Sequence, residues 1–395
     1  MQTYDVVVVG NGLAGAALSY ELIKAGCSVL LMDDGSAESG TRYSYGGIGH
    51  WAGTTELTTQ LLCAGLERHR ELPDELGAET QFRELDLLLT VEKGADVEAL
   101  RREYSLFSSR PVYVSSQEAK AIEPQLAADS IEGAFVVRHA HVNPMMLVAA
   151  YNQAFRRLGG HHNISAVTGL VKVGDSVTGV LTAAQAYPAG KVIVAAGAYS
   201  LRLLKQASVQ VPLFFTHAEI IETPPMDVSL RSLILPAANN RFKKESVTAD
   251  LDLWQKDDRQ IASPVLEAGV VQFVDQTMRI GQISRFHTAY TPPEDPTTSA
   301  LAMRSAIARQ LPALENAPGQ WRHCLVTFTA DGLPLVGAVP NVKNLHVFSG
   351  FTGPFAMVPP VAQRYAQQLS QQLSQRLSQQ REALMEALMV KRFLN

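Results

Sequence analysis

The stretch Asp5-Val-Val-Val-Val-Gly-Asn-Gly-Leu-Ala-Gly15 decides the fold of this chain. Its first five residues are a β-branched run of the kind that a parallel strand buried on both faces needs. A complete G-x-G-x-x-G follows, consisting of Gly10, Asn11, Gly12, Leu13, Ala14 and Gly15. Residues 16–24 then predict a helix closed by Gly26, and residues 28–33 predict the next strand. This is the βαβ context in which the glycine pattern indicates dinucleotide binding.

Each glycine of the pattern has its own expected task. Gly10 makes the tight turn, Gly12 lets the backbone approach the pyrophosphate, and Gly15 lets the helix pack on the strand. The phosphates are expected at the helix N-terminus. Asp33 lies 18 positions after Gly15 and can accept hydrogen bonds from ribose hydroxyls, with Asp34 as the less favoured alternative.

Length and composition are those of a folded, enzyme-sized protein. The 395 residues exceed the roughly 250–300 at which one core stops growing, so two domains are expected. The net charge is −4, and the longest basic cluster is the short Arg241-Phe-Lys-Lys244, which argues against nucleic-acid binding. Cys27, Cys63 and Cys324 form no CxxC pair, so we expect neither a disulfide framework nor a metal site.

The sequence also bears on location. No signal peptide precedes the first strand, and no stretch reaches the roughly 18 apolar residues of a membrane span. We therefore expect a cytoplasmic protein without a transmembrane segment. The oligomeric state is left open, with a homo-oligomer as one alternative.

Three further segments distinguish between dinucleotides, since the glycine pattern alone also fits NAD. Residues 41–48 are rich in small and hydroxylated side chains. Residues 191–200 predict an apolar strand that passes into the small residues Ala195, Ala196 and Gly197. Residues 331–337 read Asp-Gly-Leu-Pro-Leu-Val-Gly and lead to the glycine-rich segment 350–356.

In this order the segments resemble the D-amino-acid oxidase / glycine oxidase family of FAD-dependent oxidoreductases. The resemblance covers nearly the whole chain and includes Val142-Asn-Pro144 before an expected helix at 145–158. It implies an α/β fold with a discontinuous, Rossmann-like FAD-binding domain and a second substrate domain built mainly on an antiparallel sheet. Residues 1–85, 140–205 and 325–370 would form the FAD domain, 86–139 and 206–324 the substrate domain, and 371–395 a C-terminal helix.

The resemblance also implies which residues contact FAD. Residues 350–356 would bring backbone N–H groups and a helix N-terminus to the pyrimidine edge of the flavin, where reduction leaves negative charge. Besides the opening unit, the expected contacts are Thr41, Arg42, Ser44, Tyr45, Gly46, Gly47, Val167, Ala195, Ala196, Gly197, Gly350, Phe351, Thr352, Gly353, Pro354, Phe355 and Ala356.

The substrate site departs from the family pattern. Family members place one arginine just before the Asp-Gly-x-Pro stretch and another in the closing glycine loop, where they help to hold the substrate carboxylate. This chain has Val326 at the first position and Gly353 or Pro354 at the second. The catalytic residues therefore stay unassigned, and the substitute candidates are Arg285, His287, Arg322, His50 and Thr352.

The C-terminus carries leucines at spacings of four and seven in a Gln- and Ser-rich segment, which predicts an amphipathic helix. It would pack on its own domain or bind a partner. The leucines are Leu369, Leu373, Leu377, Leu384 and Leu388.

Three functions stay open. The first is oxidation of a C–N bond in an amino acid or secondary amine by hydride transfer to flavin N5, with O₂ or a quinone as the electron acceptor. The second keeps FAD but oxidises the C–OH bond of a 2-hydroxyacid or alcohol. The third is a flavin-binding accessory subunit that has lost catalysis.

Overall fold

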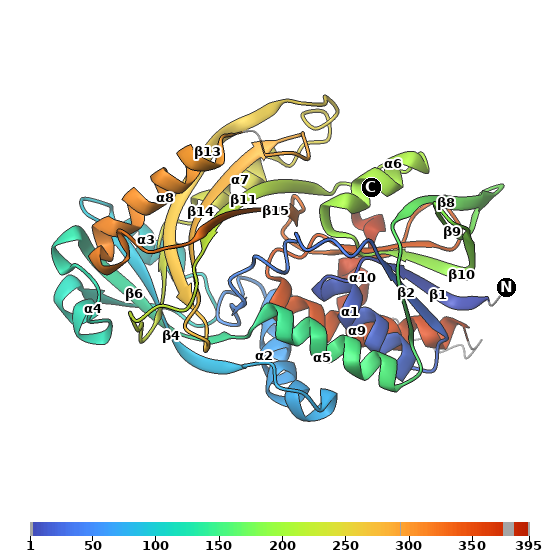
Figure 1. The fold of residues 1–395 in the computed structure, drawn as a ribbon, viewed down its shortest axis with the longest axis horizontal. Coiled ribbons are helices and arrows are strands. Elements are labelled where there is room, and N and C mark those ends of the chain that lie inside the picture. The colour runs from blue at the N-terminus through green and yellow to red at the C-terminus, as the bar shows by residue number, and fades with distance from the viewer. Residues whose placement is uncertain (1–2, 293, 374–382, 394–395) are drawn as a thin grey trace.

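The opening unit of the computed structural model, which describes residues 3–292, 294–373 and 383–393, is the predicted βαβ unit (Figure 1). β1 (Tyr4–Val9) passes through the glycine loop into α1 (Leu13–Lys24), and β2 (Val29–Asp33) lies parallel to β1. α1 begins earlier than predicted, because Leu13 and Ala14 already belong to its first turn.

β1 lies inside the first sheet, whose order is β16-β17-β10-β1-β2-β7. The strands from β17 to β7 are parallel, β16 is antiparallel to β17, and β9 and β8 extend β10 as an antiparallel ribbon. The strands added to β1 and β2 are β7 (His161–Ile164), β8 (Val167–Val173), β9 (Ser176–Thr182), β10 (Ala186–Val194), β16 (Leu335–Ala338) and β17 (Leu345–Ser349).

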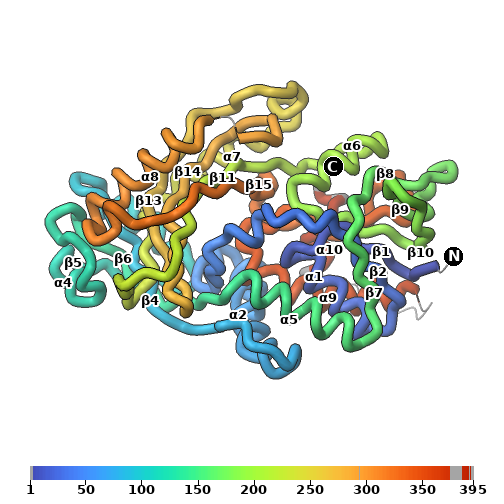
Figure 2. The backbone as a smooth tube through the Cα atoms, viewed as in Figure 1, coloured from blue at the N-terminus to red at the C-terminus, as the bar shows by residue number. Residues whose placement is uncertain are grey.

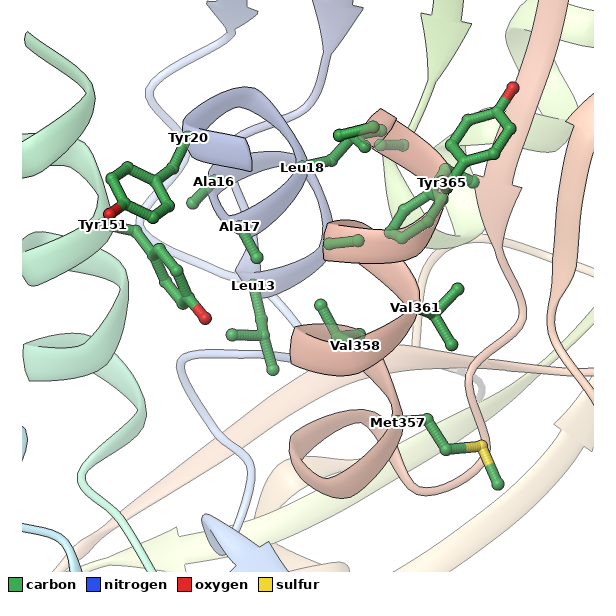
Figure 3. Packing of buried hydrophobic residues seen from close by; sticks show 14 of the residues in the cluster. Leu13, Ala16, Ala17, Leu18, Tyr20, Tyr151, Met357, Val358, Val361 and Tyr365 are labelled. Atoms are coloured by element: carbon green, nitrogen blue, oxygen red, sulfur yellow. The ribbon is translucent and has the colours of Figure 1, made fainter. Parts of the chain in front are cut away.

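The alternating valines of β1 fill the layers on the two faces of this sheet. Val6 and Val8 belong to the core cluster formed with α1, α5 (Pro144–Arg157) and α9 (Pro354–Leu373). Figure 3 shows this packing, with α1 lying between α5 and α9. Val7 and Val9 belong to the cluster on the other face, with residues of β9 and α6 (Ser200–Gln206). This two-sided burial explains the continuous apolar run in the sequence.

The second sheet has the order β15-β11-β14-β13-β12-β4-β6-β3, with β5 paired to β6. Its strand pairs are antiparallel except for β12 with β4, which confirms the predicted mainly antiparallel sheet and the mixed α/β class. Its strands are β3 (Gly47–Ile48), β4 (Arg83–Glu92), β5 (Val112–Ser115), β6 (Ile131–His141), β11 (Phe214–Glu222), β12 (Leu233–Pro236), β13 (Gln260–Gln272), β14 (Met278–His287) and β15 (Gln320–Phe328).

The remaining helices connect the strands and cover the sheets. The α-helices are α2 (Glu56–Leu76), α3 (Val97–Tyr104), α4 (Ser116–Ile122), α7 (Asn240–Thr248), α8 (Pro296–Gln310) and α10 (Ala383–Leu388). The short 3₁₀ helices are η1 (Ala128–Ser130), η2 (Gly197–Tyr199), η3 (Pro312–Leu314) and η4 (Val390–Phe393). No helix in the described ranges is long and apolar enough to cross a bilayer.

The chain passes between the two sheets several times. In Figure 2 the part around the first sheet combines blue, green and red segments, which are the beginning, middle and end of the chain. We propose the discontinuous domain division given above on this basis. Four strands of the second sheet depart from these bounds. β3 lies within the proposed segment 1–85 but pairs with β6, and β4, β6 and β15 each extend across a proposed boundary.

A buried ion-pair network joins α2 to α1. The Arg68 guanidinium contacts Glu21 of α1 at 3.1 Å and Glu75 at 2.7 Å, and its side chain is only 9% exposed. Burial alone would raise the pKa of Glu75, but hydrogen bonds from Arg68, Lys24 and Tyr20 outweigh burial and lower it to about 2. The two helices are therefore joined by charges that depend on one another.

The described C-terminal residues pack on the first sheet. Met389 forms a bridge with Val336 of β16, and Val390 is buried in the core cluster on that face. α9 is described to Leu373, and α10 is a separate short helix. Residues 374–382, through which the predicted leucine pattern runs, lie outside the described residues.

Candidate functional site

A cavity of about 1420 Å³ is lined by both sheets. Gly12 of the glycine loop and Val326 of β15 both line it. Pockets for a single small ligand usually measure roughly 300–1,000 Å³. The cavity is therefore large enough for a dinucleotide together with a small substrate.

The glycine loop is closely packed at the end of β1. Gly10 has φ 105°, and a Cβ there would lie 2.7 Å from both the Ala195 carbonyl oxygen and the Ala196 Cα. A Cβ on Gly15 would lie 1.7 Å from the carbonyl oxygen of Gly10. The loop thus approaches the end of β10 on one side and α1 on the other, so neither position has room for a side chain.

Two polar side chains hold the loop. Asp33, at the end of β2, accepts a hydrogen bond from the Asn11 backbone N–H at 2.8 Å. The Thr41 hydroxyl accepts one from the Leu13 N–H at 3.0 Å. Gly12 lines the cavity, and its missing side chain leaves backbone facing it. This bare loop fits a pyrophosphate, and Asp33 lies where a ribose would follow.

The closing segment 350–356 reaches the cavity from β17. Gly350 has φ 79°, and α9 begins at Pro354, so the positive end of that helix lies at the cavity lining. The Thr352 hydroxyl donates to the Gly332 carbonyl at 3.0 Å and joins this segment to the Asp331 turn. A ring that gains negative charge on reduction fits such a helix end.

Arg392, which follows α10, holds the Asp331 turn from outside the cavity. Its Nε donates to the Asp331 carboxylate at 2.8 Å, and its terminal nitrogens donate to the carbonyls of Leu333 at 2.6 Å and Pro334 at 3.0 Å. Asp331 and Leu333 also line the cavity. One side chain from the end of the chain thus fixes part of the cavity wall.

Arg392→Ala is expected to lower the free energy of unfolding by about 1–2 kcal/mol, because partly buried charge-assisted hydrogen bonds are lost. The variant should also retain less FAD. Thermal unfolding and FAD content after gel filtration measure the two effects. Arg138→Ala, which removes an exposed ion pair with Asp86, is the matched control. Equal behaviour of the two variants would contradict the role given to Arg392.

Most residues expected to contact the cofactor line this one cavity. They are Gly10, Gly12, Leu13, Ala14, Asp33, Asp34, Thr41, Ser44, Tyr45, Gly47, Val167, Ala195, Ala196, Gly197, Gly350, Phe351, Thr352, Gly353, Pro354, Phe355 and Ala356. Three do not. Gly15 lies behind Gly10, and a Cβ on Gly46 would lie 2.1 Å from the Val142 carbonyl oxygen. Arg42 lines a second, smaller cavity with Arg322.

Of the substitute substrate residues, only Thr352 lines the main cavity. Arg285 lies within β14, where it is paired with the buried carboxylate of Glu219 at 2.5 Å. His287 ends the same strand, 3.9 Å from Asp258. Arg322 is paired with Glu222 at 3.1 Å. His50 is likewise outside the lining.

An apolar wall from β11 and β15 completes the cavity. It consists of Ala218, Ile220 and Cys324, which the sequence did not mark as site residues, and of Val326. Burial raises the pKa of the Cys324 thiol to about 12, so it is uncharged at neutral pH. The cationic side chains in the described lining are Arg202, Arg241 and Lys243. In the sequence, the basic cluster from Arg241 to Lys244 bears on nucleic-acid binding and does not indicate a place at the cavity.

No group of three or more His, Cys, Asp or Glu side chains within the described ranges is arranged to hold a metal ion.

Comparisons with known proteins show which family the chain belongs to. A family model described as FAD dependent oxidoreductase (DAO) matches residues 5–368. 4-Methylaminobutanoate oxidase (formaldehyde-forming) of Paenarthrobacter nicotinovorans is 28% identical over 357 residues, which are 87% of this chain and 41% of that protein. The chain therefore spans less than half of that relative. Sarcosine oxidase subunit beta of Arthrobacter sp is 25% identical over 91% of this chain and 85% of its own length.

Solved structures show the same fold. Glycine oxidase from Geobacillus kaustophilus superposes with a TM-score of 0.79 at 18% identity, covering 100% of each chain. L-proline dehydrogenase from P. horikoshii superposes with a TM-score of 0.75 at 17% identity, covering 100% of this chain and 98% of the other.

Proposed function

Because the chain belongs to the DAO family of FAD-dependent oxidoreductases, we propose that it dehydrogenates a C–N bond of an amino acid or secondary amine. The observation that carries this proposal is the cavity that continues from the glycine loop to the apolar wall of the second sheet. The relatives support it, since 4-methylaminobutanoate, sarcosine and glycine, after which they are named, are all amino acids.

Bound FAD would supply the electron acceptor, taking a hydride from the substrate carbon at N5. The substrate nitrogen loses a proton in the same oxidation, and the resulting imine is hydrolysed by water to a carbonyl compound and an amine. The apolar wall at Ala218, Ile220 and Val326 would keep the reacting carbon dry and fix its orientation. For reoxidation we propose O₂ or a quinone-type acceptor.

The proposal predicts that amines bleach the flavin. Purified holoenzyme is titrated without oxygen against amino acids and N-methylated amines, and in parallel against hydroxy acids of the same carbon skeleton. At least one amine should reduce the flavin while its hydroxy counterpart leaves it oxidised. Reduction by hydroxy acids alone would replace this proposal with the alcohol dehydrogenase alternative. Reduction by neither class would favour the accessory subunit.

A further inference from the structure

Helix α7 brings an arginine to the main cavity from the side of the second sheet. Arg241 lies in the first turn of this helix and lines the cavity, and its side chain is only 15% exposed. The two positions where the family carries a carboxylate-binding arginine correspond to Val326 and to Gly353 or Pro354 in this chain, and these uncharged residues line the same cavity. A cation thus lies at the cavity, but on a different element.

The Arg241 guanidinium is held from one edge. Its Nε donates to the Glu245 carboxylate at 3.1 Å, one helical turn away. The same carboxylate oxygen accepts a hydrogen bond from the Thr216 hydroxyl of β11 at 2.8 Å. The Glu245 side chain is 4% exposed, so its position is fixed by packing. Glu245 therefore acts as a positioning residue for Arg241.

The start of α7 is held as well. One carboxylate oxygen of Glu267, on β13, accepts hydrogen bonds from the backbone N–H groups of Asn240 at 2.9 Å and Arg241 at 3.2 Å. A carboxylate at the first helical N–H groups stabilises a helix start. Both acidic residues next to Arg241 thus have donors of their own, and Arg241 is fixed through its backbone and through Nε.

The other edge of the guanidinium is available to a ligand. Within the described part of the chain, neither terminal nitrogen of Arg241 has a hydrogen-bond partner. Burial raises the pKa of the Tyr45 hydroxyl and of the Cys324 thiol, whereas the positive charge of Arg241 lowers both pKa values. These two residues line the cavity from the 41–47 loop and from β15, so the charge of Arg241 reaches that part of it.

The other two cations of the lining are less suited to hold a ligand. Lys243 is paired with Glu103 at 2.8 Å. The Arg202 guanidinium lies over the Tyr290 ring, as that of Arg241 lies over the Phe242 ring, but Arg202 is exposed whereas Arg241 is largely buried. Arg241 is therefore the lining cation best placed to receive an anionic ligand.

We infer that Arg241 binds the carboxylate of the substrate, so that the amine oxidised by this enzyme is an amino acid held from the α7 side of the cavity. The assignment of the ligand as substrate rests on the function proposed above. A guanidinium with two free N–H donors on one edge matches the two oxygens of a carboxylate, which form parallel charge-assisted hydrogen bonds with it. Arg241, on helix α7, thereby takes the role of the arginines that the family carries at other positions.

The test uses holoenzyme and a small carboxylate that cannot be oxidised at an amine. Propanoate is titrated while the flavin absorbance is followed, and propanamide serves as the uncharged analogue. Arg241→Gln is expected to raise the Kd for propanoate about 10- to 100-fold, the effect of losing a charged hydrogen-bonding partner, and to leave that for propanamide unchanged. Lys244→Gln is the matched control, because Lys244 is on the same helix but contacts Ser263 outside the lining.

A Kd for propanoate that is unchanged in Arg241→Gln, or raised equally in the control, would overturn the inference. A second measurement needs no variant: phenylglyoxal modification of Arg241 in the wild-type holoenzyme, located by peptide mass spectrometry, should be slowed by propanoate and not by propanamide. Absence of protection would also overturn it. Neither measurement requires turnover, so the carboxylate site and the proposed amine oxidation can fail separately.

Discussion

Gly15→Ala is expected to give a protein that purifies with little or no FAD. The added Cβ would lie 1.7 Å from the Gly10 carbonyl oxygen, which is backbone and cannot rotate away. α1 must then move off β1, and the turn at Gly10 moves with it. Overpacking of this kind costs about 1–3 kcal/mol, so the Kd for FAD should rise about 10- to 100-fold. Visible absorbance after gel filtration and titration of the apoprotein with FAD measure the loss.

Gly169→Ala is the matched control for this substitution. Gly169 lies in β8 of the same sheet, and a Cβ there would meet no atom within 4 Å. This variant should keep the FAD content and affinity of the wild type. If Gly15→Ala also kept both, the close approach of helix and strand would not be what shapes the cofactor site.

Arg68→Leu is expected to lower the free energy of unfolding by about 3–5 kcal/mol at neutral pH, because removing one partner leaves buried charge uncompensated. Glu21, whose side chain is 5% exposed, would lose its cationic partner inside the α1–α2 interface. Denaturant unfolding followed by circular dichroism measures the change. Arg70→Leu on the same helix removes an ion pair with Glu84 in which Arg70 is 43% exposed, and should cost at most about 1 kcal/mol.

The pH dependence of the Arg68 effect has a definite sign. The pKa of Glu75 is lowered to about 2 in the folded protein, so its contribution is present above its unfolded pKa of about 4.3 and is lost as the pH falls towards 2. Burial raises the pKa of Glu21, which therefore takes up a proton more readily. The gap between wild type and Arg68→Leu should narrow on acidification. A gap that stays constant down to pH 3 would contradict the network.

Local patterns were sufficient to predict the parts of the fold that depend on neighbouring residues. The β-branched run before Gly10 and the acidic residue at the end of the next strand lie within about 30 residues of sequence and together predict one βαβ unit. The structure contains that unit as β1, α1 and β2. The β-branched runs within 218–222 and 278–283 likewise lie in strands, β11 and β14, which form an antiparallel pair. In such segments the side-chain periodicity itself records which faces are buried.

The substrate side could not be predicted in this way, because charge pairing there is set by residues far apart in sequence. Arg285 looked like a free cation in the sequence, yet Glu219 on the neighbouring strand neutralises it. Arg241 belongs to a short basic cluster in the sequence, yet in the structure Glu267 of β13 holds the start of its helix, and Thr216 of β11 holds its carboxylate partner Glu245. Which guanidinium keeps a free edge depends on strand pairing that one sequence does not display.

The strands on one side of β1 come from much later parts of the chain. β1 pairs with β10, where Val6 lies opposite Lys191, and β10 pairs with β17 (Leu345–Ser349). Until β10 has been synthesised, one edge of the Val6–Val9 run of β1 has no strand to pair with, and an unpaired apolar edge of this kind is prone to aggregate and is what chaperones protect. Residues 350–356, which line the cofactor cavity, and Arg392, which holds the Asp331 turn, come later still in the chain, so the complete cavity can form only after they have been synthesised.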